Sequence, residues 1–174
     1  MENYEKPQEW GTYIKKEYRY EPKPPKAKKA PYRKPESIIQ LQKDVLVYQL
    51  RKHPTIPENY IPSPVFRDDT ANNLTKAILA HLRINGHFAA RVNTTGIYDV
   101  RTKRYRRGGS TLGMADVNAT VNGRAVQIEV KAGKDRPRPE QLKVAEQVRA
   151  AGGVYIFVHT FDDYLAQMRG EGLI

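Results

Sequence analysis

The stretch GMADVNATVNGRAVQIEVKAG, residues 113–133, decides the fold because its turn sets the register of a β-hairpin. Asn122-Gly123 lies between two alternating runs, which is typical of a type I′ turn with positive φ at both central residues. If Val121 pairs with Arg124, the same register places Asp116 directly opposite Glu129. The sequence therefore predicts a hairpin with two carboxylates facing each other.

The two faces of this hairpin differ in polarity. Because side chains alternate along a strand, one face collects apolar residues and is expected to pack on the core. The members of the apolar face are Ala115, Val117, Ala119, Val126, Ile128 and Val130. The polar face carries Asp116, Asn118, Thr120, Gln127, Glu129 and Lys131.

The facing acids are unfavourable for folding alone. Two charges about 5 Å apart repel by about 3 kcal/mol at an effective dielectric near 20, whereas cross-strand pairs contribute less than about 1 kcal/mol. A hard divalent cation such as Mg²⁺ would relieve the repulsion, and Lys131 on the same face would orient or deprotonate a hydrolytic water. The alternative is a solvated polar face on which Lys131 bridges the acids, and a β-bulge would shift the pairing.

The rest of residues 67–174 predicts an α/β domain with a mixed sheet. A helix with capping candidates Asp69 and Thr70 precedes a strand in residues 87–95, and the basic residues 98–113 read as a turn or loop. After the hairpin come a helix starting near Pro139, an apolar strand at 154–159 and a short helix from about Asp162. The order is helix, three strands, helix, strand, helix.

Two further segments precede this domain. Ten of the twelve prolines lie before Phe66, and residues 1–36 predict an extended basic Pro/Lys/Tyr-rich arm, either a nucleic-acid-tracking tail or a solubilising or assembly tail. Residues 37–66 predict an amphipathic helix and a Pro-rich linker. Ser37 is the N-cap candidate, and the apolar face of the helix, which packs on the domain or on a second subunit, carries Ile38, Leu41, Val45 and Tyr48.

Composition restricts the partners. The formal net charge of +11 over 174 residues favours a polyanion such as nucleic acid. Without cysteine there is no disulfide framework and no thiolate zinc site, and the four His residues have no metal-ligand spacing. No apolar stretch approaches the roughly 20 residues of a membrane span, so we expect no membrane partner and a cytoplasmic, intracellular location.

The segments GMADV, IEVKAG, the EQ that opens the next helix and the AAGG before VYIFV resemble the VRR-NUC branch of the PD-(D/E)XK nuclease superfamily. The resemblance covers roughly residues 69–159 and implies a restriction-endonuclease-like αβββαβ core. It implies that Asp116 and Glu129 bind Mg²⁺ or Mn²⁺ with the Val130 carbonyl. It also assigns Lys131 and Gln141 to the active site, and Arg91 to phosphate.

Two departures from the family pattern stand out. Ala115 replaces the proline that usually precedes the Asp, and Asn72 and Asn73 stand where the first helix usually supplies a Glu. The second change removes a ligand to the metal or its water. The basic residues expected to hold the nucleic-acid backbone, besides Arg91, are Arg104, Arg106, Arg107, Lys134 and Arg136.

These observations predict a divalent-metal-dependent endonuclease acting on DNA, possible substrates being junctions, flaps and nicks. Catalysis is expected from Asp116, Glu129, Lys131 and Gln141, and a homodimer is expected through the helix that follows Ser37. The alternatives are a catalytically inactive nucleic-acid-binding protein with the same fold, and a basic assembly protein whose arm wraps a partner.

Overall fold

The computed structural model describes residues 31–92, 97–106, 111–133 and 135–174. The compact unit that these residues form runs from Tyr32 to Ile174. The helix expected ahead of the domain therefore belongs to the same unit. Nearly all of the predicted N-terminal arm, residues 1–30, lies outside the described residues.

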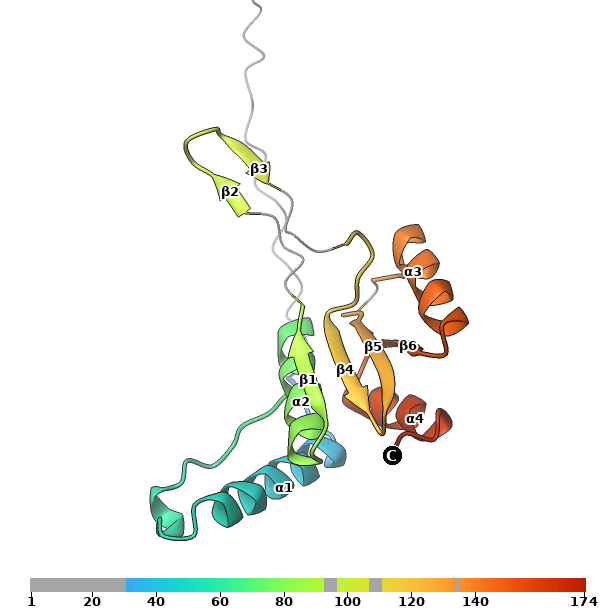
Figure 1. Ribbon diagram of the computed structural model, residues 1–174. Coiled ribbons are helices and arrows are strands. Elements are labelled where there is room, and N and C mark those ends of the chain that lie inside the picture. The colour runs from blue at the N-terminus through green and yellow to red at the C-terminus, as the bar shows by residue number, and fades with distance from the viewer. Residues whose placement is uncertain (1–30, 93–96, 107–110, 134) are drawn as a thin grey trace, which may run out of the picture. The chain divides into compact units, whose positions relative to one another are not determined.

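A mixed four-stranded sheet forms the centre of this unit (Figure 1). Its strands are β1 (Phe88–Arg91), β4 (Val117–Val121), β5 (Arg124–Val130) and β6 (Val154–Val158), in the order β1-β4-β5-β6. β4 pairs antiparallel with both β1 and β5, and β5 pairs parallel with β6. The predicted α/β class with a mixed sheet is confirmed.

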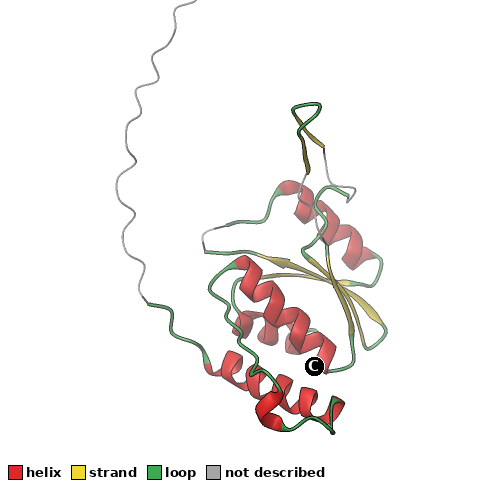
Figure 2. Cartoon of the chain, turned by 90° about the vertical axis from the view of Figure 1, so that its left-hand side faces the viewer, coloured by secondary structure: helices red, strands yellow, loops and turns green. Residues whose placement is uncertain are grey.

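Helices cover both faces of the sheet (Figure 2). On one face lie α1 (Glu36–Lys52), α2 (Ala71–Ile84) and α4 (Phe161–Gly170), whose apolar residues share one core with alternate residues of the strands. On the other face α3 (Pro139–Ala150) packs through Ala145 on Tyr155 of β6. A short 3-10 helix, η1 (Glu58–Tyr60), lies between α1 and α2.

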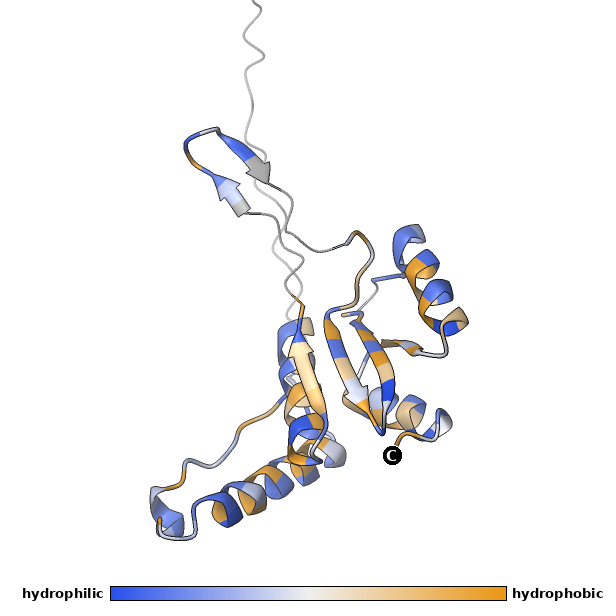
Figure 3. Cartoon of the chain, viewed as in Figure 1, coloured by the Kyte–Doolittle hydropathy of each residue, from blue (hydrophilic) through white to orange (hydrophobic). Residues whose placement is uncertain are grey.

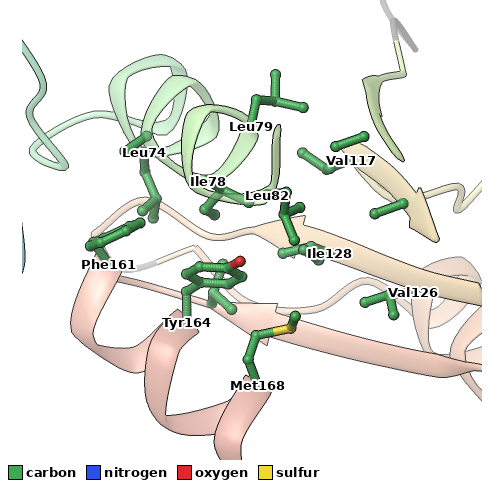
Figure 4. Packing of buried hydrophobic residues seen from close by; sticks show 14 of the residues in the cluster. Leu74, Ile78, Leu79, Leu82, Val117, Val126, Ile128, Phe161, Tyr164 and Met168 are labelled. Carbon is green, nitrogen blue, oxygen red and sulfur yellow. The ribbon is translucent and has the colours of Figure 1, made fainter. Parts of the chain in front are cut away.

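The main core is built from interleaved helix and strand side chains. Leu74, Ile78 and Leu82 of α2 point toward Ile128 of the sheet and Tyr164 of α4 (Figure 4). Their spacing of four residues places them on one side of α2. Thr70 caps this helix by accepting the N–H of Asn73 at 3.2 Å, as its sequence predicts.

The predicted hairpin register is confirmed. β4 and β5 pair Val121 with Arg124 and Val117 with Ile128, and the turn holds Asn122 and Gly123 at φ 48° and 79°. Positive φ at both positions defines the type I′ geometry that the Asn-Gly pair favours. The alternating pattern then buries Val117, Ala119 and Val121 toward α2.

The first helix settles two open points about the N-terminal region. Ile38, Leu41 and Val45 are buried in the common core, so this face packs on its own domain. The expected cap at Ser37 is wrong, because the N-cap position is occupied by Pro35, whose extended backbone leads into the first turn. Tyr48, expected on the apolar face, is instead 41% exposed.

The basic segment predicted as a turn or loop forms a second sheet. β2 (Ile97–Asp99) and β3 (Arg104–Arg106) pair antiparallel, with Tyr98 opposite Tyr105. The expectation of a loop was wrong because each strand has only three residues, and the many charged side chains obscure the alternation of apolar and polar residues on either side of the turn. We call residues 97–106 the basic ribbon.

Candidate active site

Asp116 lies immediately before the first residue of β4, where the backbone enters the sheet. Its carbonyl accepts the N–H of Val92 at 2.8 Å, which extends the β1–β4 pairing by one step. Its carboxylate Oδ2 accepts the N–H of Val130 at 3.0 Å. The side chain is thereby held across the end of β5, next to Glu129.

Glu129 is a buried acid with only 5% of its surface exposed. Burial, followed by the negative charge of Asp116, raises the pKa of its carboxyl above the usual range, and the Lys131 ammonium and the Gln141 amide act in the opposite direction. The carboxylate of Asp116 therefore works against ionisation of the neighbouring Glu129, as the predicted register implies.

Lys131 is even more deeply buried, with 1% exposed surface. Its Nζ lies 3.0 Å from Glu129 Oε1, donates to Gln141 Oε1 at 2.6 Å and lies 3.7 Å from Asp135 Oδ2. Its backbone N–H donates to the Val158 carbonyl at 2.9 Å, which anchors it just beyond the end of β5. Burial of a lysine without such partners is costly, so these contacts hold the ammonium in place.

Gln141 links the two charged groups from the first turn of α3. Its Oε1 accepts from Lys131 Nζ and, at 3.0 Å, from the backbone N–H of Arg138, while its Nε2 donates to Glu129 Oε1. The contact with Arg138 also satisfies a backbone donor at the helix start. The same amide therefore caps the helix and orders the site.

A close backbone approach holds α3 against the site. Gly113 has φ 86°, and a Cβ at this residue would lie 2.6 Å from the carbonyl carbon of Glu140. The Tyr155 hydroxyl donates to the Gly113 carbonyl at 3.3 Å. Glycine is required here because both the backbone conformation and the lack of space exclude a side chain.

The acid pair has oxygen atoms suited to a hard divalent cation. Among the described residues, hydrogen bonds engage Oδ2 of Asp116 and Oε1 of Glu129, which leaves one further oxygen on each acid. No group of three or more His, Asp or Glu side chains that could hold a metal occurs in the described ranges. Carboxylate oxygens are the ligands that Mg²⁺ prefers, and this ion usually keeps several waters.

The two asparagines at the start of α2 are already engaged. Asn72 Oδ1 accepts from the Arg91 guanidinium at 2.6 Å, and Asn73 Nδ2 donates to Asp69 Oδ1 at 2.8 Å. Arg91 pairs with Val117 across β1 and β4, and Val117 directly follows Asp116 in the sequence. Asn72 therefore orients the Arg91 guanidinium at the end of β1.

The structure brings together the four residues expected to be catalytic, Asp116, Glu129, Lys131 and Gln141. Val130 lies between Glu129 and Lys131 in the sequence. Arg104 is exposed in the basic ribbon, and Arg136 is exposed in the segment before α3. Arg106 belongs to β3, but its side chain, like residues Arg107 and Lys134, lies outside what the structure describes.

Sequence reasoning did not single out Asp135, Tyr155 or Gly113 at this site. Tyr155 lies within the apolar sequence of β6, which does not mark it as a site residue. Burial, followed by the charges of Glu129 and Asp116, raises the pKa of its hydroxyl. Asp135 follows Lys131 by four residues in an irregular segment, so no periodicity places it. For Gly113, the only indication in the sequence was its position shortly before Asp116.

Comparison of this chain with protein-family models, curated proteins and solved structures gives no match. Among the described residues, no helix has the length and apolar character needed to cross a membrane.

Proposed function

We propose that this chain is a divalent-metal-dependent nuclease that hydrolyses DNA phosphodiester bonds. The observation that carries the proposal is the buried Lys131 ammonium held between Glu129 and Gln141, with Asp116 alongside. Two adjacent acids and a desolvated lysine are a costly combination for a structural hairpin. They are suitable for a reaction in which negative charge develops on a phosphate.

Each side chain has a role in this proposal. Asp116 and Glu129 would hold Mg²⁺ or Mn²⁺ together with the Val130 carbonyl, and the bound ion would lower the pKa of its water and polarise the phosphate. Lys131 offsets charge on the pentacoordinate phosphate and steers the attacking water. Gln141 keeps Lys131 Nζ at one position, and Arg91 holds a neighbouring phosphate group.

The fold and the charge support the same proposal. Apart from the basic ribbon, the order α2, β1, β4, β5, α3, β6 agrees with the αβββαβ order of the nuclease superfamily that residues 69–159 resemble. A net charge of +11 suits a polyanionic substrate. We extend the proposal to a protein that acts on DNA inside the cell and forms a homodimer to cut two strands. The apolar face of α1, expected from the sequence to form the dimer interface, is buried in its own domain, so the dimer would use another surface.

The test uses isosteric amides that keep the packing. Asp116→Asn and Glu129→Gln should each lower cleavage by at least about 100-fold, because only the charged oxygens bind the metal tightly. Purified protein is incubated with branched, flapped, nicked and linear DNA in Mg²⁺ or Mn²⁺, and the products are resolved by electrophoresis. Glu146→Gln, on an exposed acid of α3, is the matched control. Cleavage that survives Asp116→Asn would refute the proposal.

One observation favours a second candidate, a catalytically inactive DNA-binding protein. The amide of Asn72 replaces an acid and is occupied by Arg91, so the site lacks the additional carboxylate of the family pattern. This candidate predicts DNA binding without turnover in either metal. Calorimetric titration with Mn²⁺ separates the two, since the nuclease binds the ion through Asp116 and the binding-only protein does not.

A further inference from the structure

The basic ribbon presents cations on a small, exposed element. Residues 97–106 contain one acid, Asp99, and four cationic residues, of which Arg101, Lys103 and Arg104 have described, exposed side chains. Most of the turn is coloured hydrophilic in Figure 3. This element carries a dense positive charge that the proposed active site does not use.

The ribbon also forms a sheet of its own. Within the part of the chain that the structure describes, β2 and β3 pair only with each other, and the four-stranded sheet does not include them. Tyr98 is 48% exposed and Val100 79% exposed, so apolar surface near the turn faces water. Because an isolated two-stranded hairpin is marginally stable in water, a partner that covers this surface would stabilise it.

The turn contains a lysine in an unfavourable backbone conformation. Lys103 has φ 51°, in the left-handed region where glycine or asparagine is preferred. Asp99 Oδ1 accepts the N–H groups of Arg101 at 3.0 Å and Thr102 at 3.4 Å, which holds the turn in shape. The lysine at residue 103 thus adds charge at the tip at the expense of turn stability.

We propose that the basic ribbon inserts into the major groove of duplex DNA. The major groove, about 12 Å wide and 8.5 Å deep, admits a two-stranded ribbon, and the undeformed minor groove is only about 6 Å wide. Three-residue strands extend about 10 Å, which is enough to reach the groove floor. Arg101, Lys103 and Arg104 contact the phosphates that line the groove, and Val100 contacts thymine methyl groups. The choice of DNA as the polyanion rests on the proposed function.

The test compares two charge-removing double variants of the full chain, both carrying Asp116→Asn to prevent cleavage. Arg101→Ala with Lys103→Gly removes two cations from the ribbon and relieves the strained φ, so weaker binding cannot be ascribed to a poorer turn. Arg51→Ala with Lys52→Ala removes two exposed cations from the end of α1 and is the matched control. Fluorescence anisotropy measures Kd for duplex DNA, duplex RNA and single-stranded DNA of one sequence at several salt concentrations.

The ribbon variant should raise Kd for duplex DNA by about 10-fold or more and lower the slope of log K against log salt by about 2. Its Kd for duplex RNA should change less than about 2-fold, because the A-form major groove is too narrow to enter. An equal loss on all three nucleic acids, or a loss no greater than that of the α1 control, would overturn the proposal.

In this design the nuclease proposal and the ribbon proposal can be refuted separately. If the protein without Asp116→Asn does not cut DNA and the ribbon variant still loses duplex binding selectively, the nuclease function fails and the ribbon proposal stands. If cleavage depends on Asp116 and the ribbon variant binds duplex DNA normally, the ribbon proposal fails alone.

Discussion

At the scale of single residues, the site depends on the burial of opposite charges. Glu129 lies near the end of β5 and Lys131 follows two residues later, just beyond the strand, a spacing that also occurs on solvated strands. The structure differs from that simpler case because α3 covers both side chains and inserts Gln141 between them. Each charge is therefore stable only while its partners remain.

Replacing Lys131 by Met should leave the buried Glu129 carboxylate without its cationic partner and destabilise the protein by about 3–5 kcal/mol. The double variant Glu129→Gln with Lys131→Met should be more stable than Lys131→Met alone, because no uncompensated charge is left in the interior. Urea unfolding at pH 7 measures the four free energies of this double-mutant cycle. Additive effects would show that the two residues do not interact.

Gly113→Ala should cost more than the usual penalty of a side chain at positive φ. The new Cβ would clash with the backbone of Glu140, so we expect a loss of about 2 kcal/mol or more and a displaced Gln141. Gly86→Ala is the control, since Gly86 has a similar φ of 79° and a Cβ added there would meet nothing within 4 Å. Calorimetry should give a larger fall in Tm for Gly113→Ala, and equal falls would contradict the steric argument.

At the scale of elements, α2 and α4 meet through a neutral histidine. His81 Nδ1 lies 2.9 Å from the Tyr164 hydroxyl, and the ring packs edge-on against Phe161. Burial lowers the pKa of His81 from 6.5 to about 4, with smaller contributions from the charges of His87 and Arg169 and an opposing one from Asp44. His81 thus has a structural role between the helices.

This pKa predicts how stability depends on pH. Between pH 6.5 and 4 the unfolded chain binds a proton that the folded chain excludes, so stability is complete above pH 6.5 and falls as the pH decreases. From pH 7.5 to pH 5 we expect His81 to contribute a loss of about 2 kcal/mol. Urea unfolding of His81→Gln should lack this contribution, whereas His87→Gln should retain it. An unchanged pH dependence in His81→Gln would contradict the assignment.

Elements also differ in how well the sequence predicts them. Thr70, Pro139 and Asn122-Gly123 mark boundaries that the structure confirms, because caps and turns depend on local backbone chemistry. The basic ribbon was missed because two strands of three residues contain too few alternating positions to detect.

At the scale of the whole molecule, α1 completes the core. Ile38, Leu41 and Val45 bury their side chains against α2 and α4, and the burial of three such groups stabilises by on the order of 5 kcal/mol. A chain starting at Pro54 should unfold at least about 10 °C below a chain starting at Tyr32, as measured by circular dichroism. Equal transitions for the two chains would show that α1 is dispensable.

The sequence by itself determined the hairpin register, the position of both acids and Lys131 on one hairpin face, and the α/β order of elements. These follow from local preferences and from the period of the side chains, which act over a few residues. Only the tertiary structure decided that α1 packs on its own domain, that α3 seals Lys131 from water, and that Asn72 holds Arg91. Those contacts join residues far apart in the chain, and their energies depend on burial, which no local pattern specifies.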